Sequence, residues 1–234
     1  IYLVVIIGFS ASKAGSYDNF FAAIKHDKPD VVLALLGRGF DPNTVSPEGE
    51  PALVLAVREP SFKVIDVLLD SPATRVEVRT SKDESPLMLA ALKGYATVCQ
   101  KLIARDADVN KPGWTPLHYA ATGGHLDVMR MLLESHAFID AASPNGSTPL
   151  MMAAMYGTTD AVKLLLDAGA DPSLKGDAAD DLVALALGHR REQRVFKKVV
   201  LQHGGRVAYR RRGAARGRRR AEPPAVAGGP RLVG

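Results

Sequence analysis

The sequence is poor in cysteine, which limits its covalent chemistry. Cys99 is the only cysteine among 234 residues, so an intramolecular disulfide is excluded. A reactive thiol needs a base or a cationic neighbour that lowers its pKa, and the apolar helix expected around Cys99 offers neither. We therefore expect Cys99 to be a small buried core residue. A single cysteine is compatible with cytosol or periplasm, so it does not locate the protein.

Catalytic and cofactor-binding motifs are also missing. The phosphate-binding pattern GxxxxGK[ST] and the nucleophile pattern GxSxG do not occur. His118 and His125 are seven residues apart, but glycines at 123–124 interrupt the helix between them, and a metal site needs a third ligand. Acidic residues at 177–181 lie in a loop, whereas carboxylates paired for acid–base catalysis need a cleft. We expect no catalytic residue, no metal and no cofactor.

Long hydrophobic runs are scarce, and the one at the start is short. Residues 1–9 are apolar except for one glycine, and they are too few to span a bilayer. The small-x-small segment Ser12-Lys13-Ala14 follows, as in the cleavage site of a secretory signal peptide. We expect a signal at 1–15, cut after Ala14, and a periplasmic or secreted protein. The alternative is an apolar start or first capping strand on a cytoplasmic protein.

The positive charge is confined to one end of the chain. The formal net charge is +5, but nine arginines and one glutamate after residue 205 carry +8, which leaves −3 on the remainder. The segment 206–234 lacks hydrophobic periodicity, so we expect disorder there. Three interpretations of this segment stay open. It is an electrostatic arm that binds nucleic acid or an anionic membrane, or it is a solvated tail without a partner. The third is that a GC-rich DNA sequence has been translated in the wrong reading frame.

The strongest pattern in the chain is an internal repeat. Residues 115–121 (TPLHYAA) return 33 residues later as 148–154 (TPLMMAA), and a third copy, 85–91 (SPLMLAA), lies 30 residues earlier. A period near 33 residues predicts a solenoid in which each unit packs only on its neighbours. Pairs of aliphatic residues recur in step with these segments, at 35–36, 68–69, 102–103, 132–133 and 165–166.

Each unit is expected to form a helix, a turn, a second helix and a loop. In the fourth unit, Thr115 is a good N-cap and Pro116 is tolerated in the first helical turn. The glycines at 123–124 should end this helix, and the apolar pattern over 126–133 predicts a second, amphipathic helix. A position just past the second helix favours left-handed backbone; in three units it holds Asp106, His136 and Gly169.

Together these features resemble the ankyrin repeat. The resemblance rests on Thr-Pro-Leu-His at 115–118, Gly-His at 124–125 and Gly-Ala-Asp at 169–171, and it covers about 16–205. It implies an all-α solenoid of helix-turn-helix units with short finger loops. It also implies that the His of the tetrapeptide bonds to the Thr hydroxyl and nearby backbone. The implied motif residues are Thr115, Pro116, Leu117, His118, Thr148, Pro149 and Leu150.

The resemblance also divides the chain into units, at 16–46, 47–80, 81–110, 111–143 and 144–176, with a degraded cap at 177–205. The terminal units depart from the tetrapeptide, as expected of units that cap a stack. The link at 110–113 is three residues short, so we expect a truncated finger between units three and four. A signal followed almost at once by the array is similar to bacterial exported ankyrin-repeat proteins.

The function implied by the resemblance is protein recognition in the concave groove, by a chain expected to be a monomer. Stacking aligns the finger tips and the ends of the first helices into one surface. We expect Leu92, Trp114, Met155 and Tyr156 to contribute most, because aromatic and flexible apolar side chains are common hot spots. The predicted partner-binding residues are Lys82, Glu84, Leu92, Lys93, Lys111, Trp114, Asn145, Ser147, Met155 and Tyr156.

Two other functions stay open. The first is an inhibitor or accessory partner of one envelope enzyme, which is binding with a defined target. The second is a nucleic-acid or anionic-surface binder that uses the Arg-rich tail, whose binding would fall steeply with salt.

Overall fold

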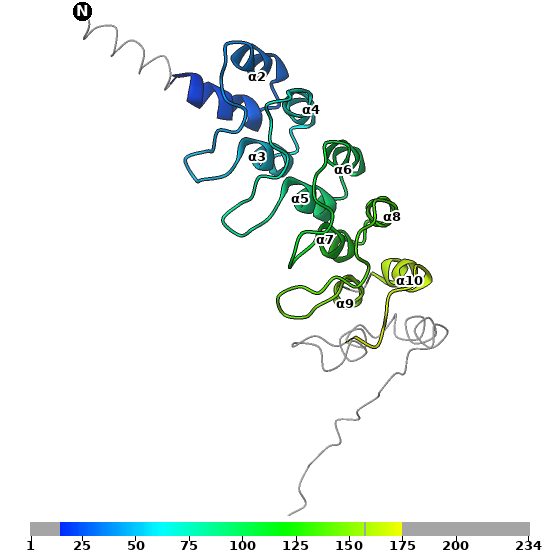
Figure 1. The fold of residues 1–234 in the computed structure, drawn as a ribbon. Coiled ribbons are helices and arrows are strands. Elements are labelled where there is room, and N and C mark those ends of the chain that lie inside the picture. The colour runs from blue at the N-terminus through cyan, green and yellow to red at the C-terminus, as the bar shows by residue number, and fades with distance from the viewer. Residues whose placement is uncertain (1–14, 157, 175–234) are drawn as a thin grey trace, which may run out of the picture.

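A computed structural model describes residues 15–156 and 158–174 of the chain (Figure 1). The expected cap at 177–205 and tail at 206–234 lie outside the described residues, as does the expected signal except for Gly15. No helix in the described part is both long enough and apolar enough for a membrane crossing.

The described chain is a stack of helix pairs. The first helix of each pair (residues 15–25, α3, α5, α7 and α9) forms an inner row, and the second (α2, α4, α6, α8 and α10) forms an outer row (Figure 1). The all-α solenoid expected from the repeat is therefore confirmed. The bounds are α2 Pro29–Leu36, α3 Ala52–Arg58, α4 Phe62–Asp70, α5 Pro86–Lys93, α6 Ala96–Ile103, α7 Pro116–Gly123, α8 Leu126–Glu134, α9 Pro149–Met155 and α10 Thr159–Asp167.

Local sequence explains where the inner helices begin and end. In α5, α7 and α9 the hydroxyls of Ser85, Thr115 and Thr148 accept a hydrogen bond from the backbone N–H three residues on, and proline follows at the first helical position. Helices α5 and α7 are capped at their C-terminal ends by Gly94 and Gly124, whose φ angles of 72° and 69° are left-handed.

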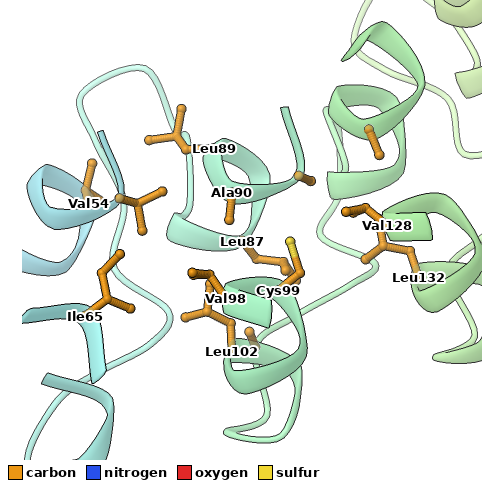
Figure 2. Packing of buried hydrophobic residues seen from close by; sticks show 14 of the residues in the cluster. Val54, Ile65, Leu87, Leu89, Ala90, Val98, Cys99, Leu102, Val128 and Leu132 are labelled. Carbon is orange, nitrogen blue, oxygen red and sulfur yellow. The ribbon is translucent and has the colours of Figure 1, made fainter. Parts of the chain in front are cut away.

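Small residues let the inner helices pack closely. Ala90, Ala120 and Ala153 are fully buried, and the inner helices contact one another more closely than the outer helices do. The inner row consequently lies on the concave side of the stack. The outer helices are amphipathic: in α6, Val98, Cys99 and Leu102 are buried among neighbouring units (Figure 2). This confirms that Cys99 is a core residue.

Polar side chains join successive units at the base of the fingers. The loop that leads from the outer helix of one unit to the next unit is called a link. In each link, a side-chain oxygen accepts a hydrogen bond from a backbone N–H of the following link. Asn43 accepts from Arg75 over 2.8 Å, and Asn110 accepts from Phe138 over 2.7 Å. The two asparagines also donate, to the carbonyls of Ala73 and His136. These bonds fix the distance between units. Carboxylates do the same at the other two links, where Glu77 accepts from Asp108 and Asp140 from Asp171.

A second ladder runs through the turns between the two helices. The Ser61 hydroxyl donates to the Ile24 carbonyl over 2.5 Å, and His125 Nε2 lies 2.9 Å from the Leu92 carbonyl oxygen. Each bond crosses from one unit to the inner helix of the preceding unit. The turn that holds His125 therefore joins two units.

The left-handed position after the outer helix is also confirmed. Asp106, His136 and Gly169 have φ angles of 61°, 64° and 99°. The side chains of Asp and His tolerate this region better than most, so the turn is kept where glycine is absent.

The fingers have two forms. The full fingers are 46–50, 80–84 and 143–147. In each, the backbone N–H of the first residue donates to the carbonyl of the fifth, over 2.8, 3.0 and 2.9 Å respectively. The fully described link 104–115 has no such bond, and Gly113 turns it with a φ of 87°. The truncated finger expected between units three and four is thus present.

Candidate functional site

The finger loops lie on the same side of the stack as the inner helices (Figure 1). We call the surface made by the finger tips and the last residues of the inner helices the groove. Because α3, α5, α7 and α9 are sandwiched between their neighbours, most of their side chains are buried, and apart from Tyr119 only the last residues of these helices are open to solvent. At the C-terminal end of each of these four helices, two residues reach the groove. They are Arg58 and Glu59 in unit two, Leu92 and Lys93 in unit three, Thr122 and Gly123 in unit four, and Met155 and Tyr156 in unit five.

Eight of the ten residues predicted for partner binding are at least partly accessible. Met155 and Tyr156 have exposed fractions of 37% and 56%. Their role in binding stays a prediction. Lys82, Lys93 and Asn145 are also exposed, and Glu84, Leu92 and Trp114 are half-buried.

Lys111 and Ser147 are buried, with exposed fractions of 8% and 4%, so the expectation that they face a partner was wrong. The truncated finger leaves Lys111 no tip to project from. Its ammonium pairs with the Asp83 carboxylate of the preceding finger and donates to the Pro112 carbonyl over 3.1 Å. The hydrogen bond from Lys111 holds the pKa of Asp83 below its usual value.

Ser147 faces inward because it closes the last full finger. Its N–H donates to the Ser143 hydroxyl over 2.9 Å. Its carbonyl lies 2.8 Å from Nε2 of His118 in the preceding unit. Ser147 therefore holds two units together instead of contacting solvent.

His118 makes the bonds that the resemblance implied. Its Nδ1 lies 3.2 Å from the Thr115 nitrogen and 2.8 Å from the Thr115 hydroxyl. Since Nδ1 accepts from the backbone N–H, Nε2 carries the proton and donates to the Ser147 carbonyl. Burial lowers the pKa of His118, opposed by the bond to Ser147. Both ring nitrogens are thus engaged by protein atoms. The described residues contain no group of three potential metal ligands.

Units two and three line the groove with charged side chains that pair with each other. The Arg58 guanidinium lies 2.9 Å from the Glu50 carboxylate and 3.7 Å from that of Glu84. Arg79 pairs with Glu77 over 2.6 Å. We call the groove surface of these two units the charged half.

Units four and five differ sharply from this. Residues 112–124 and 141–156 of their fingers and inner helices contain no Asp, Glu, Lys or Arg, and Lys111 in the truncated finger is buried in its ion pair with Asp83. We call this surface the uncharged half. Trp114 and Tyr119 are half-buried there, and Met155 and Tyr156 are exposed. Trp114 is held in place by His118, because the two rings meet edge to face with centroids 5.3 Å apart.

Tyr119, in the middle of α7, was not among the predicted residues. It occupies the variable fifth position of the repeated heptapeptide. Burial raises the pKa of its hydroxyl, and so do the nearby charges of Glu84 and Asp83. Tyr119 therefore lies where the two halves meet. Comparing the variable position across the three heptapeptides would have identified it.

Phe138 is a second residue that the sequence analysis missed. Its side chain is 65% exposed. The corresponding place in three other links holds an aspartate, Asp41, Asp108 or Asp171, whose carboxylate accepts the N–H two residues on. A phenylalanine that replaces a turn-forming aspartate is the signal that could have revealed it.

Comparisons with known proteins agree with the geometry. A family model described as "Ankyrin repeats (3 copies)" matches residues 20–112 and 87–176. The ankyrin repeat and SAM domain-containing protein 6 of Rattus norvegicus is 35% identical over 109 residues, which cover 45% of this chain and 12% of that protein. The B-cell lymphoma 3 protein homolog of Mus musculus is 30% identical over 169 residues, 69% of this chain and 38% of that protein.

Solved structures share the same fold. An ankyrin repeat domain from Acinetobacter baumannii has a TM-score of 0.71 at 24% identity, covering 80% of this chain and 98% of that one. The human ASB11 ankyrin repeat domain has a TM-score of 0.71 at 25% identity, covering 81% and 85%. The chain spans well under half the length of the curated relatives above.

Proposed function

Because this chain belongs to the ankyrin-repeat family, we propose that it is a non-catalytic module that holds a protein partner in its concave groove. Ankyrin repeats generally mediate protein–protein interaction, and the fold is typically non-catalytic. The observation that carries the proposal is that Trp114, Tyr119, Met155 and Tyr156, four large side chains of the uncharged half, are partly or fully open to solvent. Large apolar side chains in contact with water are stabilised when a partner covers them.

The physical chemistry of these side chains suits recognition. Aromatic anchors supply a large contact area with few rotatable bonds, and methionine adapts its shape to a partner. Trp114 is already ordered by its contact with His118, so it loses little conformational entropy on binding. Truncating such an anchor typically costs a complex about 2 kcal/mol or more.

The proposal is tested by site-specific photo-crosslinking in the native cell. A photoreactive amino acid would replace Tyr156 in the groove and, as a matched control, Leu33, which is 61% exposed on outer helix α2. We expect one protein to crosslink from position 156 and not from 33. Tyr156→Ala should then weaken its binding to that protein at least tenfold, whereas Leu33→Ala should not. Crosslinking from 33 alone would place the interface on the outer row.

The finer identity of the partner is a separate proposal. We propose that the chain is exported and that its partner is an envelope or secreted protein, such as an enzyme that it inhibits or assists. The support is the apolar segment 1–9 and the Ser12-Lys13-Ala14 segment. N-terminal sequencing of the native protein should give a mature start at Gly15 in the periplasmic fraction. An uncleaved chain in the cytoplasm would refute export.

The Arg-rich segment 206–234 favours a second candidate function, electrostatic binding of nucleic acid or an anionic membrane. Such binding should fall steeply with ionic strength and disappear when 206–234 is deleted. If the shortened chain bound nucleic acid as well as the full chain, this candidate would be wrong.

A further inference from the structure

We infer that the partner segment lying on units four and five is uncharged and apolar, and that the partner carries its charges toward units two and three. This inference rests on the proposed function and specifies the chemistry of the bound segment. It follows from the distribution of charge within the two units, from the pairing of charges next to them, and from the cost of desolvating a charge.

The uncharged half does not reflect a general lack of charge in these units. The segment 112–174 carries six acidic and two basic residues, yet none of them lies in the fingers or inner helices that form the groove surface. All eight lie in the outer helices or in the links. They are Asp127, Arg130, Glu134, Asp140, Asp160, Lys163, Asp167 and Asp171.

The charged half offers a different surface. Arg58 and Glu84 are engaged in ion pairs within the array, and Asp83 pairs with Lys111 of unit four. Lys93 and Glu59 are exposed at the ends of their helices, and the structure shows no ion pair for either among the described residues. An acidic side chain of the partner can therefore pair with Lys93, and a basic one can pair with Glu59.

Desolvation makes the two halves select different segments. A charged side chain pressed onto the uncharged half would lose water without gaining an opposite charge, which is strongly unfavourable. An apolar side chain there gains from burial against Trp114, Tyr119 and Met155 in proportion to the area covered. The two ends of the groove thus favour different parts of the partner, and the apolar part binds at units four and five.

The spacing of the units sets the size of the segment. Packed helices lie about 8–10 Å apart, so units four and five, each one helix spacing wide, together cover roughly 16–20 Å of the groove surface. A helix of about 11–13 residues, at 1.5 Å per residue, covers this distance. An extended peptide needs only about 5–6 residues. The predicted ligand is therefore a short linear segment with an apolar part of this length.

The test uses the full chain and a phage-displayed library of random peptides. We expect the enriched peptides to share a cluster of apolar residues without Asp, Glu, Lys or Arg. For one synthesised peptide, Met155→Lys and Met155→Glu should each weaken binding at least tenfold and to a similar degree, because both charges meet an uncharged partner. At Lys93, the substitution Lys93→Glu should alter which charges flank the enriched cluster.

The possible failures are distinguishable. If one charge at Met155 strengthens binding and the other weakens it, the partner is charged there and the inference is overturned, while the groove assignment stands. If substitutions at Met155 and Lys93 leave binding unchanged and Leu33→Glu abolishes it, the proposed groove is wrong. Failure to enrich any peptide, or a dimer in sedimentation that Met155→Lys dissociates, also overturns the inference, the latter because a second copy would be the occupant.

Discussion

Replacing His118 by methionine separates the two bonds that this side chain makes. The array already contains the replacement, since Met88 and Met151 occupy the same place in other units. Their sulfur atoms accept the backbone N–H of the helix cap, at 3.4 Å from Ser85 and 3.3 Å from Thr148. His118→Met should therefore keep the bond to its own cap and lose only the bond to the next finger.

The magnitude follows from the lost bond. His118 Nε2 donates to the buried Ser147 carbonyl over 2.8 Å. Losing a neutral hydrogen bond costs about 0.5–1.5 kcal/mol. The Ser147 carbonyl is not left unsatisfied, because it still accepts the Ser143 N–H over 2.9 Å. We therefore expect His118→Met to reduce the free energy of unfolding by about 0.5–1.5 kcal/mol. His118→Ala should cost about 2 kcal/mol more, because it also removes the cap bond and leaves a cavity.

Urea denaturation followed by far-UV circular dichroism measures both variants. The midpoint should fall in the order wild type, His118→Met, His118→Ala, with little change in the slope, since the surface exposed on unfolding is nearly the same. A His118→Met variant as stable as wild type would show that the contact with Ser147 adds nothing. Equal losses for both variants would show that sulfur does not replace Nδ1 at the cap.

The same variant removes a dependence on pH. Burial lowers the pKa of His118 below its ordinary 6.5, so the unfolded chain binds more protons than the folded chain as pH falls below that value. This stabilisation is fully present above pH 6.5 and is lost as the pH falls through the folded pKa. The difference in stability between wild type and His118→Met should accordingly shrink on acidification, and a constant difference would refute the assignment.

Three further predictions concern other sites. Burial raises the pKa of Cys99 to about 12, so it should react with a thiol reagent at pH 8 only after unfolding; rapid labelling of the folded chain would contradict this. Gly94→Ala should destabilise the array more than Gly39→Ala in urea, because both are left-handed but only at Gly94 does a Cβ meet an imidazole, at 2.4 Å. Asp83→Asn should lower the melting temperature more than Lys111→Met, since only the former leaves a buried ammonium unpaired; the reverse order would refute the pairing.

The backbone of the array could be predicted from the sequence because it depends on features that recur. The heptapeptide predicted the inner helices, and the glycines at 123–124 predicted the end of α7. His136 was recognised as left-handed only because Gly169 holds the same place in the next unit. The missing residues at 110–113 likewise predicted a truncated finger. These features can be recognised when one unit is compared with another, and they do not depend on contacts between units.

Side-chain directions at the fingers could not be predicted in the same way. Lys111 is buried because its ammonium pairs with Asp83 in the preceding finger. Ser147 is buried where its carbonyl meets His118 of the preceding unit. Both contacts cross between units, and the repeat pattern does not report them. A shortened loop brings its residues closer to the stack, so its polar side chains turn toward neighbours instead of solvent.

Recurring and varying positions of the repeat have different physical roles. Positions that recur in kind, such as the cap hydroxyls and the acceptors at the base of the fingers, join the units and are buried or bonded. Positions that vary lie at the groove: the eighth place of the inner-helix segment is Arg58, Leu92, Thr122 and then Met155. Stability requires the same bond at every junction, whereas recognition requires that neighbouring units differ. The change from a charged side chain to uncharged side chains along this series is therefore the part of the sequence that describes the partner, and substitutions along it should alter binding more than folding.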